Sequence, residues 1–485
     1  MTEQSVQLPV DGKNKEEILA TMQSLRQRDV QWRQGKTFSL VYNVGEEVAD
    51  ILKEAYTLFF SENALNPTAF PSLRRMEAEV VAMTAALLGG DRNVVGNMTS
   101  GGTESILMAV KTARDWARVH KPNATSPEMV FPATAHPAFE KAAHYFGVKS
   151  VRTPVGDDFR ADVDAIRKSI TPQTILIVGS APSYAQGVVD PISELAKIAL
   201  AEEILCHVDA CVGGFMLPFV QRLGYPPLDF DFRVPGVTSM SADLHKYGYA
   251  AKGASTILYR DKELRRYQFF VYTDWTGGIY ASPTMTGTRP GGAIAAAWAV
   301  MNFLGENGYL QIADTVMKTT LKLRAGIADI SGISVLSDPD MSIISINSNE
   351  HNIYEIGDEM TLRGWHLDPQ QFPASLHLTV NRNHADVADQ FLIDLEASTA
   401  AVRRPSLRKT RDALLLSVIQ AAVKYLPEKT VSKLMDRSTS MVGIEGSNLP
   451  QRSAPIYGMM GTLPNRADIH ELVLDLIDKM TRLED

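Results

Sequence analysis

Apolar runs of strand length alternate along this sequence with longer segments of helical periodicity. One such run, Thr174–Val178, is followed by a helical pattern over Pro191–Glu203 and then by a second apolar run over Glu203–Val208. Further runs of the same kind cover Val237–Met240 and Ser255–Tyr259. Strands that are apolar on both faces and separated by helices form parallel sheets covered by helices. The sequence therefore predicts an α/β protein with a mostly parallel central sheet.

The pattern changes after this region. An alanine-rich helix is predicted over Ala293–Leu304 and another helix over Ala313–Ile330, and alternating strands follow at Ser342–Ile346 and Leu376–Val380. A chain of 485 residues is longer than one hydrophobic core usually serves. We expect three parts: an N-terminal arm at residues 1–65, a large domain at residues 66–305 and a smaller C-terminal α+β domain at residues 306–485.

Composition limits the classes of function. The chain carries 48 Lys and Arg against 56 Asp and Glu, a net charge of −8 that disfavours a nucleic-acid or anionic-membrane binder. No segment reaches the roughly 20 apolar residues of a membrane-spanning helix, and the charged N-terminus lacks the apolar core of a signal peptide. Cys206 and Cys211 share one strand and turn, which favours buried thiols over a disulfide or a metal site. We expect a cytoplasmic protein without a membrane anchor.

A lysine stands in the run Ser241–Gly248, which follows a predicted strand and leads into glycine-containing turns. Lys246 has mostly apolar or aromatic neighbours and His245 beside it, surroundings that lower the pKa of an amine and make it nucleophilic. A solvated loop charge is the other interpretation of such a pair. A buried lysine in this setting suits a Schiff base, which indicates pyridoxal 5'-phosphate as the cofactor.

Pyridoxal phosphate needs a partner for its ring nitrogen, a cradle for its phosphate and a cover for its ring. Asp209 ends a predicted strand, where α/β sheets bind ligands, and can keep the pyridine nitrogen protonated. Thr99–Ser105 opens a helical segment with glycines that let backbone N–H groups approach a phosphate. His136 precedes another helical segment and can stack on the ring. Each residue also has an alternative role. Asp209 could cap the turn that follows it, Ser100 or Thr103 could be a helix N-cap, and His136 could be structural.

These residues stand in a sequence that resembles the sphingosine-1-phosphate lyases, a group within the group II decarboxylase-like, fold-type I enzymes that use pyridoxal phosphate. The resemblance extends from about Gly35 to about Leu483. HVDACVGGF, together with Trp275–Gly292, is more specific to the lyases. SADLHKYG and TSGGTES are similar in amino-acid decarboxylases and separate the subfamilies poorly. The other matching stretches are Asn63–Glu79, Arg363–Val380 and Ala454–Pro464.

The resemblance implies a fold-type I architecture and a role for each matching residue. Lys246 holds the cofactor, Asp209 contacts its ring nitrogen and His136 covers its ring. The resemblance also implies a homodimer with shared active sites, in which a second subunit completes the phosphate site. The implied cofactor contacts are Ser100, Gly101, Gly102, Thr103, His136, Asp209, Ser241, His245 and Lys246, with Gly287 and Thr288 from the second subunit.

The implied substrate contacts are Lys252, Tyr42, Asn66 and Tyr184. Lys252 binds the substrate phosphate as a point charge, unless it is an exposed turn lysine. Asn66 departs from the family pattern, which has histidine at this position. An amide can donate a hydrogen bond to phosphate but carries neither a charge nor a titratable proton.

The implied reaction is a retro-aldol cleavage of the C2–C3 bond of sphingosine 1-phosphate, which yields a long-chain aldehyde and phosphoethanolamine. The base for the C3 hydroxyl stays open between Lys246, Tyr184 and the substrate phosphate. A pyridoxal-phosphate-dependent amino-acid decarboxylase is the enzymatic alternative, because it uses the same lysine, aspartate and ring. A cofactor-binding scaffold protein is the alternative without enzymatic activity.

Overall fold

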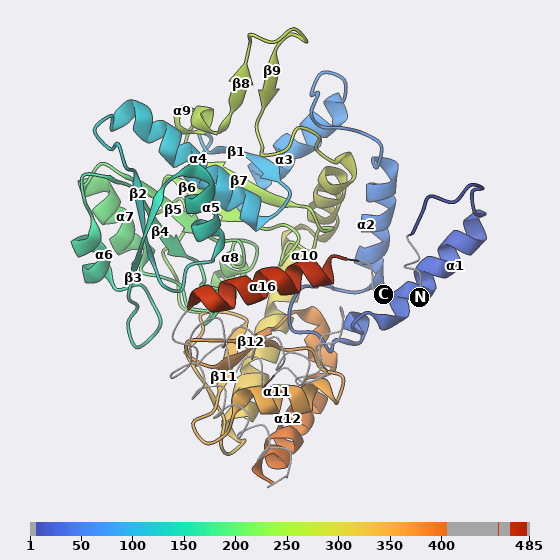
Figure 1. Ribbon diagram of the computed structural model, residues 1–485. Coiled ribbons are helices and arrows are strands. Elements are labelled where there is room, and N and C mark those ends of the chain that lie inside the picture. Colours follow the sequence, from blue (N-terminus) through green and yellow to red (C-terminus); the bar gives the residue numbers. More distant parts are fainter. Residues whose placement is uncertain (1–5, 405–453, 455–465, 483–485) are drawn as a thin grey trace.

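A seven-stranded sheet forms the centre of the larger, upper part of the molecule in the computed structural model, which describes residues 6–404, 454 and 466–482 (Figure 1). The strand order is β1-β7-β6-β5-β4-β2-β3. Strand β7 is antiparallel to both of its neighbours, and the other strands share one direction. The strands are β1 Val95–Thr99, β2 Glu128–Pro132, β3 Lys149–Thr153, β4 Thr174–Ser180, β5 Leu205–Asp209, β6 Ser239–Ala242 and β7 Ser255–Tyr259. The predicted α/β fold with a mostly parallel sheet is confirmed.

Helices cover both faces of this sheet, so its strands are apolar on both sides. In β2, Met129 and Phe131 belong to one core with α4 and α5, whereas Val130 belongs to the core on the opposite face, with α7. This double burial explains the nearly continuous apolar runs in the sequence. The helices are α3 Pro71–Leu87, α4 Gly102–His120, α5 Ala138–Phe146, α6 Val163–Ser169, α7 Ile192–Ala201, α8 Leu217–Arg222 and α9 Lys262–Arg265.

One predicted boundary in this region is wrong. The helical pattern over Pro191–Glu203 and the strand pattern from Glu203 suggest that the two elements meet at this residue. Helix α7 instead ends at Ala201 and β5 begins at Leu205, because Glu203 has a φ of 52° that neither element can contain. The chain therefore makes a tight turn before it enters the strand that leads to Asp209.

A second, smaller sheet lies at the far end of the long helix α10, Gly291–Ala328. All of its strand pairs are antiparallel, in the order β10-β11-β13-β12. The two helices predicted after residue 292 form one element, interrupted at Gly305, where φ is 57°. This part contains β10 Ser334–Val335, β11 Ile343–Asn347, α11 Ile353–Thr361, β12 Asp368–Gln370, β13 Ser375–Thr379, α12 Ala388–Arg403 and α16 Arg466–Met480. Residues 405–453 and 455–465 of the predicted C-terminal domain, with most of Ala454–Pro464, lie outside the described residues.

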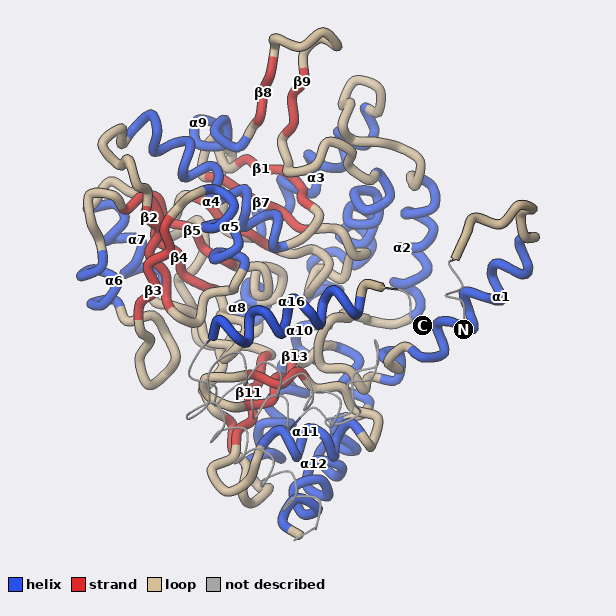
Figure 2. Tube along the Cα trace, in the orientation of Figure 1, coloured by secondary structure: helices blue, strands red, loops and turns tan. Residues whose placement is uncertain are grey.

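The N-terminal region contacts the long helix α10 and the part of the chain that precedes β12. It contains α1 Lys15–Leu25 and α2 Glu46–Leu58, and α2 packs along α10 (Figure 2). A Cβ on Gly291 or Gly292 would lie 2.8 Å from backbone oxygens of the α2 region, so the glycines permit this close contact. Nearer the N-terminus, the Phe38 amide donates to the His366 carbonyl at 3.2 Å. The three domain boundaries stay a prediction.

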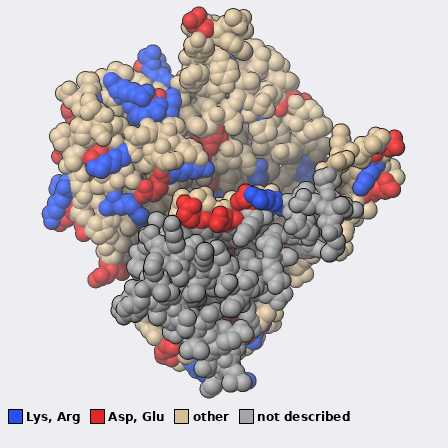
Figure 3. All heavy atoms as spheres, in the orientation of Figure 1, with Lys and Arg blue, Asp and Glu red and all other residues tan. Residues whose placement is uncertain are grey.

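A hairpin of β8 Phe270–Tyr272 and β9 Tyr280–Ser282 projects from the large sheet's side of the molecule (Figure 1). Its surface is apolar, since Trp275 is 54% exposed and Ile279 is 76% exposed. Figure 3 shows this projection as mostly uncharged, whereas Lys and Arg gather elsewhere on the same face. Among the helices that the structure describes, none combines the length and apolarity needed to cross a bilayer.

Candidate active site

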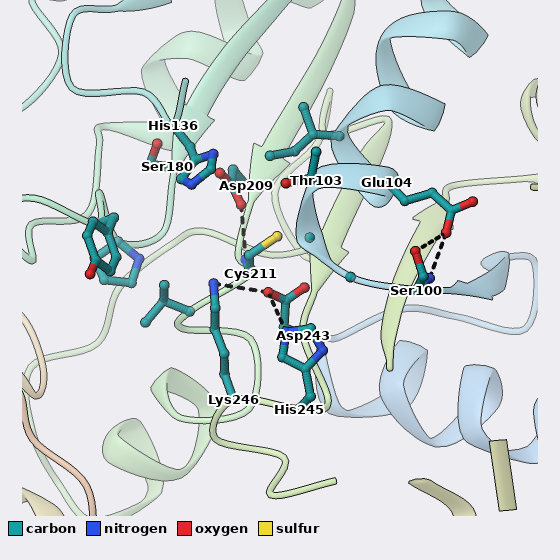
Figure 4. Close-up of a pocket in the computed structure, with 16 residues that line it drawn as sticks. Ser100, Thr103, Glu104, His136, Ser180, Asp209, Cys211, Asp243, His245 and Lys246 are labelled. Carbon is teal, nitrogen blue, oxygen red and sulfur yellow. Dashed lines mark hydrogen bonds and ion pairs between the residues drawn. The ribbon is translucent and has the colours of Figure 1, made fainter. Parts of the chain in front are cut away.

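A cavity of about 380 Å³ opens where β5 and β6 end and α4 begins (Figure 4). This volume lies in the ordinary range for small-molecule sites. The position is the one expected for an open α/β sheet, whose ligands bind beyond the carboxyl ends of the strands. The predicted site residues that line the cavity are Ser100, Gly101, Gly102, Thr103, His136, Tyr184, Asp209, His245 and Lys246.

Lys246 stands on a tight turn that follows β6. Its amide donates to the Asp243 carbonyl at 3.3 Å, and its own carbonyl accepts from Tyr249 at 2.9 Å. Glycine is needed at position 248, since a Cβ there would lie 2.5 Å from the Leu244 carbonyl oxygen. This winding directs the lysine side chain into the cavity (Figure 4).

An ion pair with Asp243 controls the charge of this lysine. The Lys246 Nζ lies 3.0 Å from Asp243 Oδ2, and the carboxylate is buried. Burial lowers the pKa of Lys246, but the charge and hydrogen bond of Asp243 together with Cys211 and Tyr42 outweigh burial, so the pKa lies above its ordinary value. The expectation of a lowered pKa is therefore wrong for the cofactor-free protein. The only sequence signal for Asp243 was its place three residues before the lysine.

Asp209 is the last residue of β5 and faces the same cavity. Its Oδ1 accepts from the Cys211 amide at 3.1 Å and from the Ser241 hydroxyl at 3.2 Å. Ser241 lies beneath the cavity wall, where it also contacts the His207 ring at 3.3 Å. Asp209 thus caps its own turn and also faces the cavity, and Ser241 acts on the site through Asp209.

The cradle is the first turn of α4. The helix begins at Gly102 after Gly101, and no side chain caps it, so the N-cap alternative for the cradle hydroxyls is wrong. A Cβ on Gly102 would lie 2.8 Å from both Asp243 Oδ2 and Cys211 Sγ, so only glycine allows the helix to begin this close to the lysine turn. The free N–H groups of an uncapped helix start attract anions.

Glu104 holds this cradle in place, a role that the sequence did not reveal. Its Oε2 accepts from the Ser100 amide at 2.6 Å and from the Ser100 hydroxyl at 2.7 Å. Its Oε1 accepts from the Met285 amide at 2.8 Å, in the loop that precedes α10. Ser100 therefore uses its hydroxyl to fix the loop.

Two histidines line the cavity in the neutral form. Burial lowers the pKa of His136 below its ordinary value, and its Nδ1 accepts from the Ala138 amide at 3.1 Å. Burial likewise lowers the pKa of His245 to about 4, and its Nδ1 accepts from the Ala254 amide at 3.3 Å. A neutral imidazole presents a flat, weakly polar face, which suits the predicted role of His136 as a ring cover.

Tyr184 enters the cavity wall from the loop after β4. Its hydroxyl donates to Asp368 Oδ2 at 3.2 Å, and its ring stacks on His377 at 4.2 Å between centroids. Burial, followed by the charge of Asp368, raises the pKa of Tyr184 well above its ordinary value. The phenol therefore stays protonated. The small sheet thus supplies part of the site, and this link is not visible in the sequence.

Lys252 and Tyr42 lie beside Lys246 without lining the cavity. The Lys252 Nζ donates to the His245 carbonyl at 3.2 Å and lies 5.4 Å from the centre of the Tyr42 ring. The Lys252 side chain reaches solvent, yet partial burial and the Lys246 charge lower its pKa to about 8. Burial raises the pKa of Tyr42 to about 12. This pair forms a second polar area next to the lysine turn.

Three predicted residues lie away from the cavity in the single chain. The Asn66 Oδ1 accepts from the Thr68 amide at 3.1 Å and from its hydroxyl at 2.7 Å, so the asparagine caps its own turn. Gly287 and Thr288 belong to the loop before α10, and Thr288 contacts the Asn63 amide at 3.4 Å. The roles of all three stay predictions.

Both cysteines are buried free thiols, as predicted. Cys211 lines the cavity, and burial raises its pKa well above the ordinary value. Its thiol is therefore unreactive at neutral pH. Within the residues that the structure covers, no cluster of histidine, cysteine and carboxylate side chains could hold a metal ion.

The arrangement has a counterpart in known proteins. Residues 1–348 match the family model described as the pyridoxal-dependent decarboxylase conserved domain. The chain belongs to this family. Within the family it falls among the sphingosine-1-phosphate lyases, because it is 42% identical to the sphingosine-1-phosphate lyase of Oryza sativa over 97% of this chain and 81% of that protein. It is also 44% identical to sphingosine-1-phosphate lyase 1 of Rattus norvegicus over 86% of this chain and 74% of that protein.

Two solved structures are similar to this one. The sphingosine-1-phosphate lyase of Burkholderia pseudomallei superposes with a TM-score of 0.79 at 38% identity, over 87% of this chain and 98% of that one. The glutamate decarboxylase of Lactobacillus brevis superposes with a TM-score of 0.73 at 20% identity, over 83% of this chain and 96% of that one. The second likeness shows the shared fold alone, and with the first it confirms the fold-type I architecture.

Proposed function

We propose that this protein is a pyridoxal-phosphate-dependent aldehyde-lyase of sphingolipid metabolism. Its reaction cleaves the C2–C3 bond of sphingosine 1-phosphate to a long-chain aldehyde and phosphoethanolamine. The observation that carries the proposal is the placement of Lys246, Asp209 and the uncapped start of α4 around one cavity, in a chain that is about 40% identical to sphingosine-1-phosphate lyases over most of its length.

The donor set of the cavity fits pyridoxal phosphate. Lys246 supplies an amine, and Asp209 supplies a buried carboxylate on the neighbouring strand end. Gly102 and Thr103 offer backbone N–H groups for a phosphate, and His245 lies next to them. When bound, the cofactor takes up the electron pair that is left on C2 as the C2–C3 bond breaks.

The chain's own residues prepare this chemistry. Lys246 holds the cofactor through its amine once the proton shared with Asp243 has left. Asp209 keeps a proton on the pyridine nitrogen, and its bonds to Cys211 and Ser241 fix the carboxylate in place. His136 covers the ring with an uncharged imidazole. The protonated pyridine nitrogen therefore does not share Asp209 with a histidine cation.

Lys252 and Tyr42 supply the contact for the substrate phosphate. The ammonium lies beside the lysine turn but outside the cavity, so a phosphate there does not compete with the cradle. The substrate of an amino-acid decarboxylase carries no phosphate, so it would make no such contact with the Lys252 ammonium. Asn66 can donate to the substrate phosphate through its side-chain amide only if the turn that it caps moves. We therefore expect it to contribute least to substrate affinity among the predicted contacts.

A homodimer completes the proposed site. The β8–β9 hairpin exposes apolar side chains, which a second copy of this chain would cover. The neighbouring loop carries Gly287 and Thr288, which we propose reach the partner's cofactor phosphate. A cytoplasmic location stays a prediction.

The test is a substrate panel with the purified protein and pyridoxal phosphate. Sphingosine 1-phosphate and a set of amino acids are incubated separately, and aldehyde, phosphoethanolamine and carbon dioxide are measured. Aldehyde from the wild type but not from Lys246→Ala supports the proposal, and Lys141→Ala serves as the matched control. Carbon dioxide from an amino acid, without aldehyde, moves the protein to the decarboxylases. Neither product, with the cofactor bound, favours the scaffold alternative.

A further inference from the structure

Tyr184 is joined to the small sheet by a carboxylate that is distant in the sequence. Its hydroxyl donates to Asp368 Oδ2 at 3.2 Å, across 184 sequence positions. Because the phenolic proton is directed at the carboxylate, the oxygen lone pairs of Tyr184 are free to accept a proton from the cavity side. The geometry therefore suits a group that takes one proton while it gives up another.

A partly exposed histidine, His366, lies between Asp368 and solvent. The His366 Nε2 lies 3.5 Å from Asp368 Oδ1, and the side chain of His366 is 41% exposed. The backbone of His366 is held on both sides, since its amide donates to the Lys36 carbonyl at 2.8 Å and its carbonyl accepts from Phe38 at 3.2 Å. The three side chains thus form a line from the cavity wall to water.

The groups around Asp368 keep its carboxyl group deprotonated. Burial raises its pKa, but His366, Ser39 and His377 together lower it more, so the pKa lies below the ordinary value and the group is a carboxylate at neutral pH. His377 is fully buried and stays neutral, since burial lowers its pKa to about 4. Tyr42 and Lys246 also act on Tyr184, since Tyr42 raises its pKa and the Lys246 charge lowers it.

We propose that Tyr184, Asp368 and His366 form a proton relay between the cavity and solvent, through which the proton of the C3 hydroxyl leaves the site. This inference rests on the proposed lyase function and settles which of the candidate bases acts. Tyr184 touches the substrate and is catalytic, whereas Asp368 and His366 act through it as positioning residues.

The step balances atom by atom. The O–H bond of the C3 hydroxyl breaks, and a new O–H bond forms on Tyr184 Oη as the phenolic proton passes to Asp368 Oδ2. The C3 oxygen becomes the aldehyde oxygen, and the C2–C3 electron pair stays with C2. The proton on Asp368 then passes by way of His366 to water. One proton returns to C2 from solvent, so the overall reaction consumes none.

The test compares kcat for sphingosine 1-phosphate in Asp368→Asn, Tyr184→Phe and His366→Asn across a range of pH. We expect Asp368→Asn and Tyr184→Phe each to lower kcat by about 100-fold, the usual scale of general acid–base catalysis. The double variant is no slower than Tyr184→Phe alone, because the two residues act as one unit. His366→Asn lowers kcat in dilute buffer by less than Asp368→Asn does, and added imidazole restores it.

Controls separate a relay from a structural role. Absorbance of the bound cofactor measures loading independently of turnover, and we expect all three variants to load as the wild type does. Asp389→Asn and His144→Asn, at exposed positions, keep the wild-type kcat. If Asp368→Asn does not bind the cofactor, the relay is tested by the kcat of Tyr184→Phe and by the imidazole rescue of His366→Asn.

The failures are distinguishable. A wild type that cleaves, with Asp368→Asn or Tyr184→Phe at the wild-type kcat, overturns the relay and leaves the lyase function standing. A His366→Asn defect that imidazole does not relieve also overturns it. A wild type that loads the cofactor but releases no aldehyde overturns both proposals together.

Discussion

Asp243 lies 3.0 Å from Lys246, the residue three positions later in the same turn, and its buried carboxylate lies against the start of α4. The carboxylate holds the lysine as an ammonium, whereas attachment of a carbonyl cofactor requires the free amine. This ion pair therefore holds the lysine in its unreactive form. Loading must remove one proton from this pair.

Replacement of Asp243 by asparagine tests this relationship. Without the carboxylate, burial and the neighbouring Lys252 charge lower the pKa of Lys246, so the rate of cofactor attachment becomes half-maximal at a lower pH. At pH 7 we expect attachment to be about 10-fold faster, the change for one pKa unit. Stopped-flow absorbance of cofactor-free protein mixed with pyridoxal phosphate measures it. An unchanged pH profile, with Asp389→Asn as the control, contradicts this account.

Lys252 predicts a pH dependence for substrate binding. Since its pKa is lowered to about 8, its positive charge is present below this pH and is lost above it. Affinity for a phosphate substrate is therefore complete below pH 8 and falls as the pH rises through it, so kcat/KM decreases there. Lys252→Ala lowers kcat/KM at pH 7 by about 10- to 100-fold, the scale of a charged hydrogen bond, and removes this pH-dependent decrease. A variant that keeps the alkaline decrease shows that another group titrates.

Gly102 predicts a steric effect on the cradle. Alanine there places a Cβ 2.8 Å from Asp243 Oδ2 and Cys211 Sγ, so the helix start or the lysine turn must move. We expect a loss of about 1–3 kcal/mol in unfolding free energy and weaker cofactor binding. Gly101→Ala is the matched comparison, because its nearest atom is His245 Cε1 at 3.4 Å. Thermal unfolding and cofactor titration measure both variants, and equal losses in the two contradict the steric explanation.

The β8–β9 hairpin predicts the basis of dimer formation. A charge at a buried apolar contact is costly, so Ile279→Asp shifts the protein toward the monomer in sedimentation velocity experiments. Leu321→Asp, at an exposed position of α10, leaves the mass unchanged. A dimer that tolerates Ile279→Asp excludes the hairpin from the interface.

The central sheet and much of the site could be predicted because each rests on local patterns. Asp209 and Lys246 follow strands that share one direction, so parallel pairing brings their ends together at one edge. Ile106, Val110 and Ala113 repeat at helical spacing and are buried in α4. A regular pattern therefore predicts both the element and the face that it buries.

The remaining site residues depend on contacts that carry no pattern. The pairing of Asp243 with Lys246 depends on the particular turn between them, whereas the sequence suggested mostly apolar or aromatic neighbours and His245. Asp368 reaches Tyr184 from another sheet, and no periodicity links positions so far apart in the chain. The same reason explains the error at Glu203, where one positive φ decides the boundary.

The most direct measurement of the central claim is the reaction in D₂O, with both products analysed by mass spectrometry. Cleavage of the C2–C3 bond followed by protonation at C2 places one deuterium on carbon in phosphoethanolamine and none on carbon in the aldehyde, and Lys246→Ala yields neither product. Unlabelled phosphoethanolamine, or product formation without Lys246, would contradict a lyase that works through this lysine.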